Sequence, residues 1–301
     1  MQKRLSNRAT FMAMDVSFEE AEVVVFGAPF DGTTSYRPGT RFAAGQLRCE
    51  SEGIETYSPL LDLDLEDFKI CDLGDVNLSN GNTIKCLEEI KEVTKEVLEA
   101  GKKPLMIGGE HLVTLPVMEA LFEKYQDIHV IHFDAHTDLR QTYHNETLSH
   151  ATVIRRIHDL LGDGHIFQFG IRSGTKEEFN FALKDYHTYM EPFTVHSVAK
   201  VLKSLKGCPV YVTLDLDVLD PSIFPGTGTP EAGGITYREL ETVFTALKNA
   251  EVELVGADLV ELSPHYDQSN VSTLVACKVL RELALLVSSK KREEEIIDET
   301  A

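Results

Sequence analysis

The sequence predicts an α/β fold in which helices cover both faces of a mainly parallel β-sheet. Short apolar runs typical of buried strands recur along the chain, and longer amphipathic segments typical of helices lie between them. This alternation is characteristic of βαβ units, whose crossover connections are right-handed. The 301 residues contain no long linker, repeat or low-complexity tract, so we expect a single domain over residues 1–301.

Seven apolar runs fit buried parallel strands, because such strands are covered on both faces and are apolar almost throughout. The runs are Glu22–Phe26, Lys69–Leu73, Pro104–Ile107, Ile128–Phe133, His165–Phe169, Pro209–Leu214 and Glu253–Val260. A weaker candidate for a further strand lies near Phe193–His196.

Helical patterns fill the segments between these runs. In Ile84–Ala100, for example, Ile90, Val93 and Val97 fall on one face of an amphipathic helix. The other candidates are Leu112–Tyr125, Ala151–Leu161, Thr175–Tyr186, Val198–Leu205, Tyr237–Asn249 and Val271–Leu286. We place the core of the domain at about residues 20–287 and expect the charged tail, residues 288–301, to fray.

The composition excludes several classes of protein. The formal charge of −20 argues against nucleic acid as a partner, because phosphate binding requires clustered Lys and Arg. No apolar run is long enough to cross a membrane, and no secretory signal follows the basic N-terminus. The five cysteines are scattered without paired spacing, so we expect reduced thiols and a cytoplasmic protein.

Acidic and histidine side chains follow three of the predicted strands. The motif Gly-Gly-Glu-His occupies residues 108–111, Asp-Ala-His-Thr-Asp occupies 134–138, and Asp-Leu-Asp occupies 215–217. Because the carboxyl ends of parallel strands share one edge of an open sheet, we expect these side chains to meet in space. The candidate metal ligands are His111, Asp134, His136, Asp138, Asp215 and Asp217.

Four aspartates and two histidines form a strongly anionic set of ligands that is too acidic to gather without cations. Oxygen and imidazole ligands without cysteine favour Mn²⁺ or a similar divalent ion over a structural zinc. Aspartates shared between two ions would create a dinuclear centre, which can generate hydroxide from water at neutral pH.

Two further residues have both a functional and a structural interpretation. His150 would shuttle a proton, or it is a solvated histidine at a helix start. Glu261, which follows the last predicted strand, would clamp a cationic head group, or it is a surface or helix-start carboxylate. The glycine-rich segment Pro225–Gly234 fits no phosphate-binding motif, so we expect a loop that walls the site.

These motifs, extended to Asp-Leu-Asp-Val-Leu-Asp-Pro at residues 215–221, resemble those of the ureohydrolases, the family of arginases and agmatinases. Similar segments follow the family order from about residue 20 to residue 287. The chain looks most like the bacterial agmatinases. Glu110 fits that group, and the loop Arg140–Thr147 lacks the stretch with which arginases hold an amino acid.

The resemblance implies a three-layer α/β/α fold with a mainly parallel eight-stranded sheet. It also implies two Mn²⁺ ions per subunit, one bound by His111, Asp134, Asp138 and Asp215, and the other by His136, Asp134, Asp215 and Asp217. Asp134 and Asp215 would bridge the ions. The catalytic residues that the resemblance implies are His150, Asp138 and Glu261, of which Glu261 would hold the substrate guanidinium.

The reaction expected from the resemblance is hydrolysis of agmatine to putrescine and urea, by attack of a hydroxide that bridges the two ions on the guanidinium carbon. The alternatives are a guanidinobutyrase, an arginase, a metal-dependent amide deacetylase and a non-catalytic paralogue. The resemblance further implies a homo-oligomer, either a trimer or a hexamer.

Overall fold

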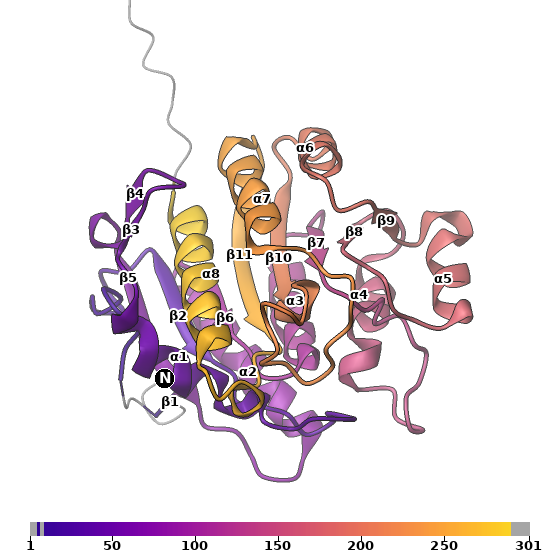
Figure 1. Cartoon of the computed structure of the whole chain (residues 1–301), viewed down its shortest axis with the longest axis horizontal. Coiled ribbons are helices and arrows are strands. Elements are labelled where there is room, and N and C mark those ends of the chain that lie inside the picture. Colours follow the sequence, from indigo (N-terminus) through magenta and orange to yellow (C-terminus); the bar gives the residue numbers. More distant parts are fainter. Residues whose placement is uncertain (1–4, 7–8, 290–301) are drawn as a thin grey trace, which may run out of the picture.

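The computed structural model describes residues 5–6 and 9–289 of the chain (Figure 1). Most of the charged tail, whose fraying was predicted, therefore lies outside the described residues. The strands of the central sheet are β1 (Leu5–Ser6), β2 (Val23–Gly27), β5 (Ile70–Val76), β6 (Lys103–Ile107), β7 (His129–Phe133), β8 (Ile166–Phe169), β9 (Tyr189–Glu191), β10 (Pro209–Asp215) and β11 (Glu253–Val260). A separate hairpin consists of β3 (Tyr57–Ser58) and β4 (Leu63–Asp64).

The nine strands of the sheet lie in the order β1-β5-β2-β6-β11-β10-β7-β8-β9. The strands from β5 to β9 in this order are parallel, and the two-residue β1 adds one antiparallel edge. The predicted fold, with eight parallel strands, is confirmed.

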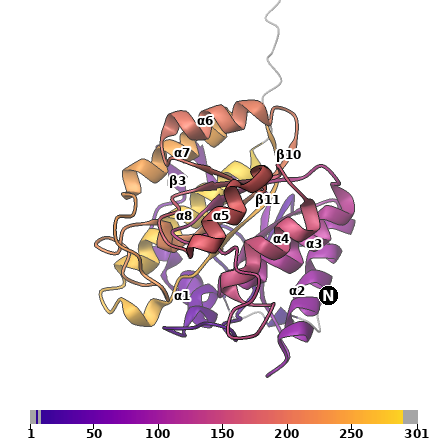
Figure 2. The same ribbon diagram turned by 90° about the vertical axis from the view of Figure 1, so that its right-hand side faces the viewer.

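Helices cover both faces of the sheet (Figures 1 and 2). One face carries α1 (Ala43–Glu50), α6 (Val195–Ser204), α7 (Tyr237–Asn249) and α8 (Val271–Ser288). The other carries α2 (Thr83–Glu99), α3 (Thr114–Lys124), α4 (Val153–Leu161) and α5 (Lys176–Leu183). The short 3-10 helices are η2 (Thr40–Phe42), η3 (Ser51–Gly53), η4 (Leu65–Asp67), η5 (His111–Val113), η6 (His150–Thr152), η7 (Lys184–Tyr186), η8 (Leu216–Val218) and η9 (Pro264–Tyr266).

Each face of the sheet packs into its own apolar core. On β10, Val210 and Val212 point into the core under α6, α7 and α8, whereas Tyr211 points into the core under α2, α3 and α4. Successive side chains of a strand point to opposite faces, so a strand between two cores must be apolar at almost every position. This is why continuous apolar runs located the strands so well.

The predicted strand near Phe193–His196 is wrong. The edge strand β9 ends at Glu191, and α6 begins at Val195. The side chain of Thr194 caps that helix by accepting a hydrogen bond from the backbone N–H of Ser197 at 3.1 Å. A segment of four residues with two apolar side chains, Phe193 and Val195, is too short to distinguish a strand from the first turn of a helix.

The strands β6, β11, β10 and β7 end side by side at the centre of the sheet. β6 and β7 follow one another in the sequence, but β11 and β10 lie between them in the sheet. The chain adds strands outward in opposite directions on the two sides of this point, and in open α/β sheets ligands bind at such switch points, beyond the carboxyl ends of the strands. No helix in the described residues is long and apolar enough to cross a membrane.

Candidate metal centre

Side chains from the four central strands meet at the carboxyl edge of the sheet. His111 begins η5 just after β6, Asp134 follows β7, Asp215 ends β10, and Glu261 follows β11. All four are buried. The predicted meeting of residues distant in sequence is present, and the parallel register of the strands brings it about.

His111 points one ring nitrogen into a group of carboxylates. Its Nδ1 lies 3.1 Å from Asp134 Oδ2, 3.4 Å from Asp138 Oδ2 and 3.3 Å from Asp215 Oδ2. Its Nε2 lies 2.9 Å from Thr213 Oγ1, a contact that fixes the ring. The buried Nδ1 has no hydrogen-bond partner of good geometry.

His136 forms a second, adjoining group. Its Nδ1 lies 3.4 Å from Asp134 Oδ1 and 3.0 Å from Asp217 Oδ2. The two oxygens of Asp134 therefore face different histidines, so this carboxylate belongs to both groups. Asp215 lies on the His111 side, where its Oδ1 accepts the backbone N–H of Asp217 at 2.8 Å. All six predicted ligands are within these two groups.

The charges of the two groups are unbalanced without cations. Burial and the neighbouring aspartates raise the pKa of Asp215 well above its ordinary value, and they raise that of Asp138 to about 7. Burial alone would lower the pKa of His111, but the neighbouring carboxylates of Asp134, Asp138 and Asp215 raise it well above its ordinary value. Such crowding of buried carboxylates would favour bound cations at this site.

The donors fit two divalent cations. They comprise hard carboxylate oxygens and two imidazole nitrogens, and the buried His111 Nδ1 lacks a hydrogen-bond partner. No cysteine belongs to either group in the described residues. Such a set suits Mn²⁺ or a similar ion better than a structural zinc, which commonly takes thiolates.

Two glycines precede His111 because the chain there passes too close to its neighbours for a side chain. A Cβ on Gly109 would lie 1.9 Å from the backbone oxygen of Phe30, and one on Gly108 would lie 2.5 Å from Val260 Cγ1. Close packing, rather than freedom to turn, explains this glycine pair. A side chain at either position would displace the backbone that carries His111.

Two site residues adopt a left-handed backbone conformation. The φ angle is 51° at Asp138 and 65° at Glu261. Such angles are costly for residues other than glycine, and they persist where the surrounding contacts enforce them. At Asp138 these contacts include Glu178, which accepts hydrogen bonds from Thr137 Oγ1 at 2.6 Å and from the backbone N–H of Leu139 at 3.2 Å.

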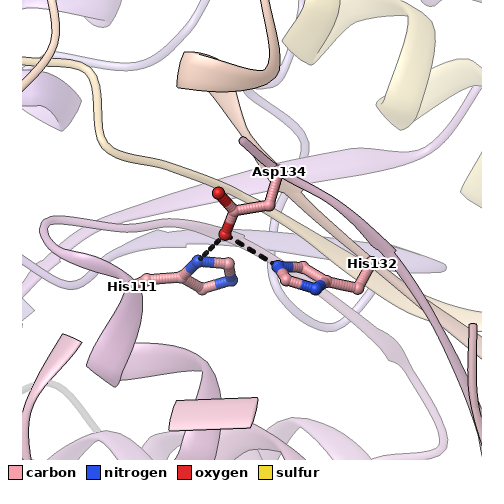
Figure 3. A group of neighbouring side chains, drawn as sticks. All are labelled: His111, His132 and Asp134. Carbon is pink, nitrogen blue, oxygen red and sulfur yellow. Dashed lines mark hydrogen bonds and ion pairs between the residues drawn. The ribbon is translucent and has the colours of Figure 1, made fainter. Parts of the chain in front are cut away.

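The His132 ring contacts the Asp134 carboxylate and helps to orient it (Figure 3). Its Nε2 lies 2.8 Å from Asp134 Oδ2, and its Nδ1 lies 3.0 Å from Gln168 Nε2. The Gln168 amide is oriented by donation to the backbone oxygen of Thr137 and by acceptance from Thr188 Oγ1. His132 Nδ1 therefore accepts a hydrogen bond, and Nε2 carries the proton that is donated to Asp134. Burial lowers the pKa of His132, which keeps the ring neutral.

Replacing His132 with phenylalanine is expected to weaken metal binding by about 10- to 100-fold, the usual effect of losing a residue that orients a ligand. The aromatic ring fills the space, but the proton that orients Asp134 is lost. Competition with a chelator measures the affinity. His129→Phe, at the opposite end of the same strand, is the matched control. Equal affinities of the two variants would refute the supporting role.

His150 lies beside a cavity that adjoins the metal groups. The cavity has a volume of about 260 Å³, and its lining includes Ser35, His136, Asp138, Tyr143, His150 and Thr229. The Nε2 of His150 lies 3.1 Å from Ser35 Oγ. Burial, together with His136 and His111, lowers the pKa of His150 to about 4, so the ring is neutral at pH 7.

Glu110 anchors the loop that holds His150. This buried carboxylate accepts hydrogen bonds from the Thr33 backbone N–H at 2.9 Å, from Thr34 Oγ1 at 3.1 Å and from the Thr33 hydroxyl. The Thr33 hydroxyl oxygen in turn accepts the backbone N–H of His150 at 3.0 Å. Burial raises the pKa of Glu110 to about 7. Glu110 thus orders the segment that presents Ser35 to His150.

Glu261 lies against the metal groups but does not line this cavity. Its Oε1 accepts the backbone N–H of His111 at 2.8 Å. A Cβ on Gly228 would lie 3.4 Å from Glu261 Oε2, so the glycine-rich loop packs directly on this carboxylate. Thr229 of the same loop donates to Asp217 Oδ2 at 3.2 Å. The loop therefore walls the site, as predicted.

Comparison with known protein families matches residues 21–286 to the Arginase family. The chain belongs to the arginase family. An agmatinase from Bacillus anthracis is 50% identical over 276 residues, which cover 91% of this chain and 95% of that protein. An agmatinase from Bacillus subtilis is 48% identical over 276 residues, with the same coverage of 91% and 95%.

Among solved structures, a provisionally named agmatinase from Clostridium difficile is 58% identical, with a TM-score of 0.88 and coverage of 90% of this chain and 99% of that one. The ureohydrolase resemblance stated from the motifs is therefore confirmed, as is its closeness to bacterial agmatinases.

Sequence reasoning missed several contacts of this arginase-family site. His132 is not among the predicted site residues, although it precedes Asp134 by two positions. Residues two apart on a strand point to the same face, so this spacing could have indicated contact. The contact between Ser35 and His150, and that between Thr229 and Asp217, join distant segments without a comparable spacing.

Proposed function

We propose that this arginase-family protein hydrolyses agmatine to putrescine and urea at a centre of two Mn²⁺ ions. The observation that carries the proposal is the pair of adjoining carboxylate–histidine groups that share Asp134. Similarity to agmatinases over most of the chain supports the choice of substrate.

The proposed ligands follow the two groups, and Asp215 of the His111 group is proposed as a further ligand of the second ion. One ion would be held by His111, Asp134, Asp138 and Asp215, and the other by His136, Asp134, Asp215 and Asp217. When bound, two such ions lower the pKa of water and so make hydroxide available at neutral pH. This chemistry is needed because the delocalised guanidinium carbon is a poor electrophile.

The protein's own residues position the substrate and move protons. Glu261 would hold the guanidinium through charge-assisted hydrogen bonds, for which its place beside the metal groups is suited. The leaving amine requires a proton, which Asp138 and His150 would relay at the cavity that both line. Ser35 keeps the His150 ring in place during the transfer.

The surroundings of Arg140 favour agmatine over substrates that carry a carboxylate. The Arg140 Nε lies 3.6 Å from Glu178 Oε2, and its guanidinium carbon lies 4.7 Å from the centre of the Tyr143 ring. The one arginine that lines the cavity is thus paired with a carboxylate of the protein. Arginine and guanidinobutyrate would bring a second carboxylate without a free partner here.

Urea release from agmatine, arginine and guanidinobutyrate, assayed with added Mn²⁺, tests the substrate. We expect kcat/KM for agmatine to exceed the others by at least about 100-fold, since an unpaired carboxylate in a closed site costs a few kcal/mol. Faster turnover of either other compound would identify an arginase or a guanidinobutyrase instead. Absence of urea from all three would refute the proposal.

Metal analysis of the same preparations separates the remaining alternatives. Two ions per chain are expected, whereas a single zinc would favour an amide deacetylase. A metal-free chain without urea release would indicate a non-catalytic paralogue.

We also propose a cytoplasmic homo-oligomer, trimeric or hexameric, built from single-domain subunits. The five cysteines are free thiols in the structure, which supports a reducing compartment. Light scattering on the purified protein measures the number of subunits, and a monomer would contradict the proposal.

Replacing His150 with alanine is expected to leave two ions bound and to lower kcat by about a hundredfold, the usual contribution of a proton-transfer residue. Metal analysis and urea release over neutral pH measure the two effects. His144→Ala, in the nearby loop but outside the cavity lining, is the control. Normal turnover of His150→Ala throughout this range would remove the proton-relay role.

A further inference from the structure

A second group of histidine and aspartate side chains lies apart from the metal centre. His158 belongs to α4, Asp163 follows that helix, and His187 follows η7. The Nε2 of His158 lies 2.8 Å from Asp163 Oδ1, and the Nδ1 of His187 lies 2.5 Å from the same oxygen. Potential ligand atoms of the three residues all lie within 4.8 Å of one another.

Packing holds both rings of this group in place. The His187 ring stacks on Phe181 at a centroid distance of 4.5 Å, and the His158 ring meets the same phenylalanine edge-on at 5.1 Å. The side chains of His158 and His187 are 12% and 18% exposed, whereas that of Asp163 is 54% exposed. The group is therefore ordered on its inner side and open to solvent on its outer side.

The charges around the group leave room for a cation. Among the described residues, the ion-pair partners of Asp163 are the two histidines. The nearby Asp159 is paired with Arg155 and Arg156, and it lies 3.9 Å from His158 Nδ1. No lysine or arginine forms an ion pair with Asp163 in this part of the chain. The two ring nitrogens thus face a carboxylate that is not paired with a lysine or arginine among the described residues.

We propose that His158, Asp163 and His187 form a separate site for zinc or a similar transition-metal ion. The arrangement parallels the candidate metal centre, where histidine nitrogens also converge on carboxylate oxygens. The donor balance differs, however, because two imidazoles and one carboxylate favour zinc over the manganese that suits a carboxylate-rich centre. Water would complete the coordination on the exposed side.

Such an ion would join two elements that support the catalytic site. η6, which begins with His150, leads directly into α4, so the ion would secure the far end of the helix that follows His150. Glu178, in the first turn of α5, accepts a hydrogen bond from the hydroxyl of Thr137 in the loop of the candidate metal centre. His187 lies beyond the end of α5, so the ion would also hold the segment that follows this helix. We therefore expect zinc to raise the melting temperature by about 5 °C at a hundredfold excess over Kd.

The test is a zinc titration of protein that has first been loaded with Mn²⁺ and freed of excess metal. Calorimetry measures zinc affinity, and elemental analysis measures zinc and manganese in the same samples. The His158→Gln/His187→Gln variant removes both rings. The His165→Gln/His196→Gln variant removes two histidines outside the group and serves as the matched control. Displacement of manganese by zinc should affect both variants alike, so the difference in bound zinc between them measures binding at this site.

We expect the wild-type and control proteins to bind one more equivalent of zinc than the His158→Gln/His187→Gln variant. Zinc should also raise the melting temperature of these two proteins but not that of the variant. Asp163→Asn provides a second test if the double variant does not fold, because this exposed side chain is not part of the core. Its zinc affinity should fall at least about tenfold with urea release unchanged. Equal zinc binding by wild-type protein and Asp163→Asn, or by the two double variants, would overturn the proposal.

Discussion

Replacing Asp134 or Asp215 with asparagine is expected to lower urea release from agmatine by at least about 10³-fold and to reduce the bound manganese. Asp134 faces both histidines, at 3.1 Å from His111 Nδ1 and 3.4 Å from His136 Nδ1. Loss of its charge would weaken both ion sites at once, and a bound ion contributes several kcal/mol to such a reaction. Urea release and elemental analysis measure the two effects.

Asp220→Asn is the matched control for these variants. Asp220 lies in the same segment as Asp215 but accepts backbone N–H bonds from Ser222, Gly233 and Gly234, so it serves a turn rather than the metal groups. We expect this control to retain its metal and nearly all of its activity. Full activity of Asp134→Asn or Asp215→Asn would contradict the shared role of these carboxylates.

Replacing Glu261 with glutamine is expected to lower kcat/KM for agmatine by about 10³-fold while leaving the metal content unchanged. The amide oxygen can still accept the backbone N–H of His111, so the local fold should persist. The negative charge opposite the guanidinium is lost, however, and removing one partner of a buried charged pair costs about 4 kcal/mol. Urea release as a function of agmatine concentration measures the loss.

Glu231→Gln removes a negative charge from the glycine-rich loop without touching the metal groups, and we expect nearly normal kinetics from it. If Glu261→Gln retained the wild-type kcat/KM for agmatine, Glu261 would not be the residue that holds the guanidinium. If it lost manganese, its main role would be to support the centre through His111.

The sequence by itself determined the class of fold and the residues of the candidate metal centre. Strands buried on both faces must be apolar at nearly every position, so β10 and β11 could be located closely from their residues. The candidate ligands follow strands, and parallel strands bring their carboxyl ends to one edge of the sheet. His111, Asp134 and Asp215 could therefore be placed together before their distances were known.

Only the tertiary structure decided the order of the strands and the contacts around the ligands. The insertion of β11 and β10 between β6 and β7 puts Glu261 beside His111, although 150 residues separate them. Glu110 likewise reaches His150 through Thr33, and the hydrogen bond between Thr33 and His150 joins residues that are 117 positions apart in the sequence. Such contacts depend on how the packed layers bring distant loops together. Local apolar periodicity reports only which side of an element is buried, so it cannot predict them.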